Sequence, residues 1–169
     1  MSAIINNKVS DSGLITIDLA SFIPSNEIIL FDIKPFLFME LILKEKDFRT
    51  ALLQIDWNQY TDKIVGIFCS TDAIIPMWAN MLIVSYLQPV AKLVYFGDEH
   101  KVREQLILEK INEVNPLDYT DQRVVIKGCG ETKIEESAYV AITQKLRPTV
   151  KSIMFGEPCS TVPVFKRKD

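Results

Sequence analysis

The chain has 169 residues, which is long enough for one domain with its own hydrophobic core. A hydrophobic content of 48%, with only 6 glycines and 8 prolines, excludes a disordered or low-complexity protein. The 19 Lys and Arg residues against 22 Asp and Glu residues give a net charge of −3, so the chain has no overall positive field for binding nucleic acid.

The amino-terminal residues 1–12 are polar and lack the apolar run of a secretory signal, so we expect them to be flexible. The most apolar stretches, 36–43 and 73–84, are each interrupted by a polar residue and are too short to cross a bilayer. We therefore expect a cytoplasmic protein that forms a single domain over residues 1–169, with neither a membrane nor a nucleic acid among its partners.

The first predicted elements are two strands, over residues 14–19 and 27–33. A helix is predicted over residues 35–53. The alternation of strand and helix that begins here continues along the rest of the chain.

A repeat occupies much of the remaining sequence. Residues 55–98 align without a gap with residues 114–157 at a constant offset of 59, and 13 of the 44 aligned positions are identical. Each copy predicts a buried strand, then a helix whose apolar residues recur every four positions, then a second strand that ends at a glycine. Residues 99–114, between the copies, have a helical pattern, and residues 161–169 can add a strand at an edge.

This order of elements predicts an α/β fold, since strands that alternate with helices pair in parallel with the helices on the faces of the sheet. We expect one mostly parallel sheet of five or six strands with flanking helices, built on a duplicated βαβ unit.

The two predicted helices differ on the side away from the core. The first has Pro76, Met77, Trp78 and Val84 where the second has Glu135, Glu136, Ser137 and Thr143. An apolar outer face needs a cover, because it would otherwise expose a hydrophobic patch to water. We expect the cover to be the segment 36–39 of the same chain or, in a homodimer, the apolar helix 76–88 of a second copy.

The polar residues that follow the predicted strands indicate a binding site, because ligands of open α/β folds bind at the carboxyl ends of the strands. The three cysteines and the only histidine, His100, belong to this group. Thiolates favour zinc or iron, so Cys69, Cys129 and Cys159 are candidate metal ligands, with His100, Asp98 or Glu157 as a fourth. No two cysteines form a C-x-x-C pair, and the alternative is that the cysteines are buried structural residues.

A second interpretation uses the loops that lead into the helices. Their backbone N–H groups can bind a small anion, and the candidate ligand-binding residues are Ser70, Asp72, Glu157 and Ser160. Capping and turn formation is the competing explanation for Ser70, Thr71 and Asp72. Neither a dinucleotide-binding nor a P-loop motif occurs.

Three function classes therefore remain open. The leading hypothesis is binding of a metal ion or small ligand at the cysteine-bearing strand ends. The first alternative is a thiol-dependent enzyme with Cys129 or Cys69 as nucleophile, which would need His100 as its base. The second alternative is a non-catalytic interaction protein or homodimer.

Four stretches carry a resemblance to a known family. They are LKEKDFR at 43–49, FCSTDAIIP at 68–76, IKGC at 126–129 and GEPCSTVP at 156–163. These stretches resemble the bacterial family catalogued as domain of unknown function 2480. The resemblance extends over nearly the whole chain and implies a single full-length domain, but it implies no reaction, cofactor or catalytic residue.

Overall fold

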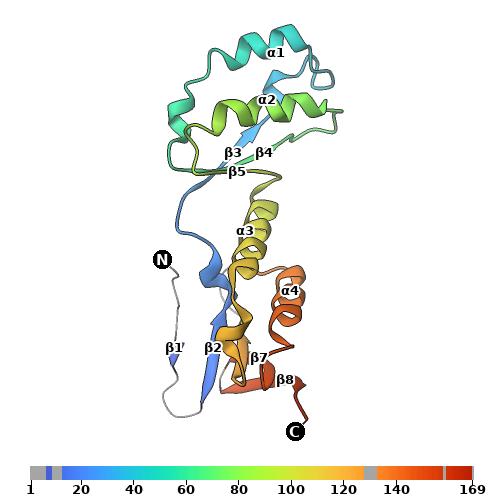
Figure 1. Cartoon of the computed structure of the whole chain (residues 1–169). Helices are drawn as coiled ribbons and strands as arrows, with labels where there is room; N and C mark the ends of the chain where they lie inside the picture. The colour runs from blue at the N-terminus through green and yellow to red at the C-terminus, as the bar shows by residue number, and fades with distance from the viewer. Residues whose placement is uncertain (1–6, 9–12, 128–132, 158, 169) are drawn as a thin grey trace. The chain divides into compact units, whose positions relative to one another are not determined.

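The computed structural model describes residues 7–8, 13–127, 133–157 and 159–168 (Figure 1). This part of the chain forms four α-helices and two sheets in which most neighbouring strands are parallel, so the predicted α/β class is confirmed. The chain divides into two compact units. Unit 1 comprises residues 1–24 and 104–169, and unit 2 comprises residues 25–103.

Unit 2 contains a sheet of three parallel strands. The strands are β3 (Ile28–Asp32), β4 (Ile64–Phe68) and β5 (Leu93–Phe96), and they lie in that order. Helix α1 (Glu45–Leu52) connects β3 to β4, and helix α2 (Met77–Leu87) connects β4 to β5.

One face of this sheet packs against both helices, as Figure 1 shows. Phe48 of α1 and Ile83 of α2 are completely buried, and both belong to one apolar cluster with Phe31 and Val65 of the sheet. Burial of such large side chains supplies most of the free energy that stabilises a unit of this size.

Unit 1 contains a sheet of five strands with parallel strands at its centre. The strands, in spatial order, are β1 (Asn7–Lys8), β2 (Leu14–Asp18), β6 (Arg123–Lys127), β7 (Ser152–Glu157) and β8 (Ser160–Lys166). The edge strands β1 and β8 are antiparallel to their neighbours. The expected strand over the last residues is therefore present as β8.

Helices α3 (Glu99–Glu113) and α4 (Glu136–Leu146) contribute to the core of unit 1. Ile107 and Ile142, one from each helix, belong to the same apolar cluster as Val124 of β6. The division between the units falls within α3, after Arg103. None of the described helices is long and apolar enough to cross a membrane.

The prediction of one sheet of five or six mostly parallel strands is wrong. Strand β4 lies between β3 and β5, whereas β6 lies between β2 and β7. The repeat predicts strands β4 and β5 in its first copy and β6 and β7 in its second. Both β6 and β7 are already hydrogen-bonded on each side, so neither β4 nor β5 can pair with them in a common sheet. The expectation of a single domain over residues 1–169 stays a prediction.

The prediction of one long helix over residues 35–53 is also wrong. Met39 and Glu40 have φ angles of 52° and 59°, and a right-handed helix cannot contain two such residues in succession. They form the tip of a tight hairpin in which the Phe38 N–H donates to the Ile42 carbonyl at 2.7 Å. The helix consequently begins only at Glu45.

Local geometry recurs between the units at the offset of 59. The bounds of α2 and α4 differ by this number at both ends. Asp62 and Asp121 have φ angles of 60° and 59°. The backbone N–H of each donates to an equivalent carbonyl, that of Val90 at 3.2 Å and that of Thr149 at 3.0 Å.

The buried aromatic residue of α1 provides a test of the unit 2 core. Replacement Phe48→Ala should lower the free energy of unfolding by about 3–5 kcal/mol, because it removes a fully buried side chain and leaves a cavity. The control is Leu53→Ala, because Leu53 directly follows the same helix and is exposed. This replacement should change the free energy of unfolding by less than about 0.5 kcal/mol. Urea unfolding followed by circular dichroism measures both, and equal losses would contradict this description of the core.

Candidate functional site

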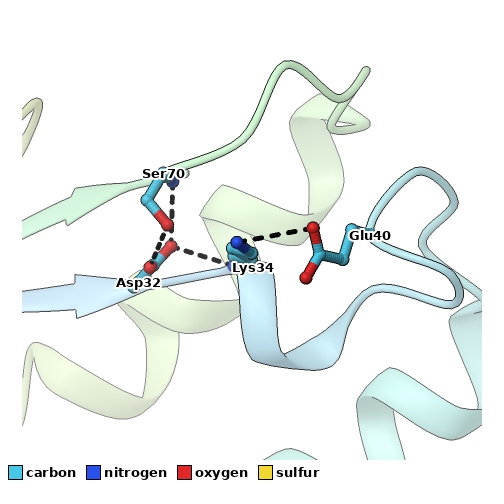
Figure 2. A network of polar contacts seen from close by, with 4 residues as sticks. All are labelled: Asp32, Lys34, Glu40 and Ser70. Carbon is cyan, nitrogen blue, oxygen red and sulfur yellow. Dashed lines mark hydrogen bonds and ion pairs between the residues drawn. The ribbon is translucent and has the colours of Figure 1, made fainter.

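Asp32 is the last residue of β3 and joins three parts of unit 2 (Figure 2). Its Oδ1 atom accepts hydrogen bonds from the backbone N–H groups of Lys34, at 2.9 Å, and of Ser70, at 3.0 Å. Its Oδ2 atom accepts a hydrogen bond from the Ser70 hydroxyl at 2.5 Å. The carboxylate thus links the ends of β3 and β4 to the short 3₁₀ helix Lys34–Phe36.

These contacts lower the pKa of Asp32. Partial burial raises the pKa of the carboxyl group, but the hydrogen bonds from Ser70 and Lys34, with the positive charge of Lys34, outweigh this effect. The net pKa lies below the ordinary value of 3.8, so Asp32 is ionised at neutral pH. An ionised acceptor forms stronger hydrogen bonds than a neutral one.

The hairpin 38–42 is attached beside this carboxylate. Lys34 Nζ lies 3.4 Å from Glu40 Oε2, the pair drawn in Figure 2. Lys44 Nζ lies 3.4 Å from the centre of the Phe38 ring. Both contacts are exposed and weak individually; the first attaches the tip of the hairpin, and the second attaches its first residue.

A groove of about 420 Å³ lies between this hairpin and the loop that follows β4. Its lining residues are Leu41, Ile42, Leu43, Asp72, Ala73, Ile74 and Pro76. Asp72 is the only charged residue among them, and no other residue in the described part of the chain donates a hydrogen bond to its carboxylate or pairs with it. The groove is therefore an apolar surface with one negative charge that faces solvent.

Unit 1 has a slightly larger hollow of about 490 Å³. Residues of α4, β6, β7 and β8 line it, and none of them is charged. Its polar side chains are those of Tyr139, Thr143 and Gln144, so it has no charged group that could select a ligand by the sign of its charge. The groove that contains Asp72 is for this reason the better candidate site.

The predicted residues of unit 2 lie at the carboxyl edge of its sheet. Ser70 and Asp72 share the loop after β4, and Cys69 before them is partly buried against the core. Asp98 instead accepts a hydrogen bond from the Lys101 N–H at the start of α3. His100 is an exposed residue of the same helix.

The predicted residues of unit 1 lie around the turn between β7 and β8. Glu157 is paired in register with Ser160, and its carboxylate lies 3.4 Å from Lys127 Nζ. Cys159 is exposed between these two strands, and Cys129 lies outside the described residues. The expectation of one common edge for all these residues is wrong, because the strands that they follow belong to two different sheets.

A metal site is not formed by the described residues: within residues 7–8, 13–127, 133–157 and 159–168, no group of three His, Cys, Asp or Glu side chains could hold a metal ion. The zinc or iron site built on Cys69, Cys129 and Cys159 stays a prediction, since Cys129 is not part of that search.

Sequence reasoning missed Asp32 and one wall of the groove. Asp32 could have been found, because it stands near the end of the expected strand 27–33 and the same strand-end rule applies to it. Residues 41–43 were not predicted to line a groove, because they lie within the helix that was expected over residues 35–53. No glycine or asparagine marks the tight turn that separates them from the preceding segment.

A comparison with models of known protein families gives a match over nearly the whole chain, as the four motifs predict. The model of the family described as "Protein of unknown function (DUF2480)" matches residues 3–167. The chain belongs to the DUF2480 family. No curated protein and no solved structure matches this DUF2480 chain, so the features of its candidate site come from its own residues.

The Asp32 contacts predict a pH-dependent stability. Because the pKa of Asp32 is lower in the folded protein, its contribution is complete above about pH 4 and is lost as the pH falls through the lowered value. Replacement Asp32→Asn should lower the free energy of unfolding by about 1 kcal/mol at pH 7, with a smaller difference from the parent protein below pH 4.

The matched control is Asp18→Asn, since Asp18 ends β2 and accepts one hydrogen bond from the Ala20 N–H in the equivalent manner. Urea unfolding between pH 2.5 and 7 measures the two variants. If the loss in Asp32→Asn were the same at every pH, the ionised carboxylate would not be the stabilising group.

Proposed function

We propose that this DUF2480 protein binds a small molecule that has an apolar body and one positively charged amine. The binding site is the groove between the hairpin 38–42 and the loop after β4. The observation that carries the proposal is the single carboxylate, Asp72, in a lining that is otherwise apolar.

The size and chemistry of the groove support this ligand class. A volume of about 420 Å³ is within the range of pockets that bind small molecules. The apolar lining favours burial of hydrocarbon, and the Asp72 carboxylate favours a cation over an anion. The expected small anion is therefore the less favoured ligand at this edge, although binding of an anion elsewhere stays a prediction.

The walls of the groove are supported by fixed contacts. Asp32 holds the Ser70 end of one wall, and the Lys34–Glu40 ion pair holds the hairpin of the other. A groove whose walls are already in place loses less conformational entropy when a ligand binds. Ser70 acts in this proposal as a positioning residue, since its hydroxyl donates to Asp32.

The other expected ligand residues and functions keep the status of predictions. Glu157 and Ser160 would belong to a second site in unit 1, at the β7–β8 turn. A thiol-dependent reaction at Cys69 or Cys129 would be indicated by rapid, selective alkylation of that cysteine. A metal bound by the cysteines would be detected by elemental analysis of the purified protein.

We also infer that the two βαβ segments arose by duplication. The recurrence of helix bounds, left-handed residues and hydrogen bonds at the offset of 59 supports this origin. The buried pair Phe48 and Leu52 of α1 has its counterpart in Ile107 and Ile111 of α3 at the same offset, outside the aligned sequence.

Two probes of equal length and opposite charge test the proposed ligand class. Hexylamine should shift the amide resonances of groove residues in two-dimensional NMR, whereas hexanoate should not. Replacement Asp72→Asn should weaken hexylamine binding about two- to fivefold, as expected for one exposed charge pair. Replacement Asp72→Lys should reverse the preference between the probes.

The control Asp47→Asn removes an exposed carboxylate of α1 in the same unit and should leave hexylamine binding unchanged. Shifts spread evenly over the protein, or equal affinity of the parent and Asp72→Asn proteins, would contradict the proposed site.

A further inference from the structure

Helix α2 has two apolar faces. Ala79, Ile83 and Leu87 form the inner face and are completely buried. Met77 and Met81 form an outer stripe, with 79% and 71% of their surface exposed, and Val84 continues it. We call Met77, Met81 and Val84 the outer stripe of α2. Its spacing of four and then three residues is that of a helix that packs against another helix.

The equivalent helix of unit 1 shows that the fold does not require this stripe. The positions of α4 at the offset of 59 are Glu136, Val140 and Thr143, of which only one is aliphatic. Both helices bury the same inner positions, so their outer faces are free to differ. The methionines of α2 are therefore an addition to an otherwise common helix.

The ring contacts of the described residues connect the segment 36–39 to α2 through Phe48 of α1. The Phe36 ring contacts Phe48 at 5.7 Å, and Phe48 contacts Trp78 at 6.0 Å. Trp78 is half-buried, with the Phe48 ring and the Arg49 guanidinium against its own ring. The outer stripe stays exposed within the described part of the chain, as the fractions for Met77 and Met81 show.

The charges at the ends of α2 indicate which partner fits. A helix carries a partial positive charge at its amino end and a partial negative charge at its carboxyl end. The other α-helices all have an acidic residue in the first turn and a basic residue in the last, whereas α2 has neither. The paired residues of the other helices are Glu45 with Arg49, Glu99 with Lys110, and Glu136 with Lys145.

An antiparallel copy of α2 supplies the missing compensation, because it places the carboxyl end of one helix beside the amino end of the other. No residue from Met77 to Leu87 is charged, so two copies can approach without repulsion between like charges. A strongly charged partner would find no complement on the stripe.

We propose that the outer stripe of α2 is the interface of a homodimer in which the α2 helices of two copies pack antiparallel about a two-fold axis. Met81 and Val84 lie nearest the axis, and Met77 faces Gln88 of the partner subunit. Such an interface is self-complementary, as two-fold symmetry requires.

Sedimentation equilibrium of the full chain tests the dimer. The parent protein should sediment as a dimer at micromolar concentrations, and Met81→Glu should raise the dissociation constant at least tenfold, because two carboxylates then meet near the axis. The matched control is Val140→Glu, at the equivalent and also exposed position of α4, and it should leave the dimer intact. A monomeric parent protein, or equal effects of the two variants, would overturn the proposal.

A cross-linking experiment tests the orientation. A mixture of Met77→Cys and Gln88→Cys proteins should form a mixed disulfide dimer under mild oxidation, in excess of that formed by the parent chain with its natural cysteines. Preferential linking of Met77→Cys to itself would overturn the antiparallel arrangement. The Met81→Glu protein should still bind hexylamine although it no longer dimerises. This result separates the dimer proposal from the groove proposal.

Discussion

The carboxylate of Asp32 is the contact on which the candidate site depends. It accepts hydrogen bonds from two segments that are 36 residues apart in the chain, at Lys34 and Ser70. Neither segment has regular structure of its own beyond a short 3₁₀ turn, so backbone pairing does not hold them together beyond the sheet edge. A single ionised acceptor does this because charge-assisted hydrogen bonds remain strong when the acceptor is only partly exposed.

The local structure of this chain can be predicted from its sequence pattern, whereas the pairing of its strands cannot. The four-residue spacing of Ala79, Ile83 and Leu87 predicts the buried face of α2, which depends only on neighbouring turns of one helix. Which strand lies beside β6 depends on contacts between distant residues, and β6 and β4 have similar buried patterns. Periodicity alone cannot distinguish one six-strand sheet from two sheets of such strands.

The candidate site was partly predictable for the same physical reason. Ser70 and Asp72 could be placed because a residue that follows a parallel strand must lie at its carboxyl edge. The opposite wall could not, because Met39 and Glu40 adopt left-handed backbone conformations that their side chains ordinarily disfavour. Side-chain contacts such as the Lys34–Glu40 pair support that turn, and the spacing of these two residues does not by itself predict it.

Comparison of the two units separates what the fold needs from what it only permits. Ala138, Ile142 and Leu146 of α4 repeat the buried residues of α2, so this inner face is a requirement of packing a helix on a parallel sheet. The outer positions carry no such constraint, and α4 has a glutamate and a threonine there, as solvent favours. Exposed methionines on α2 oppose that preference without adding to the core. The proposed dimer accounts for them, because a second copy would cover apolar side chains that the core of unit 2 does not use.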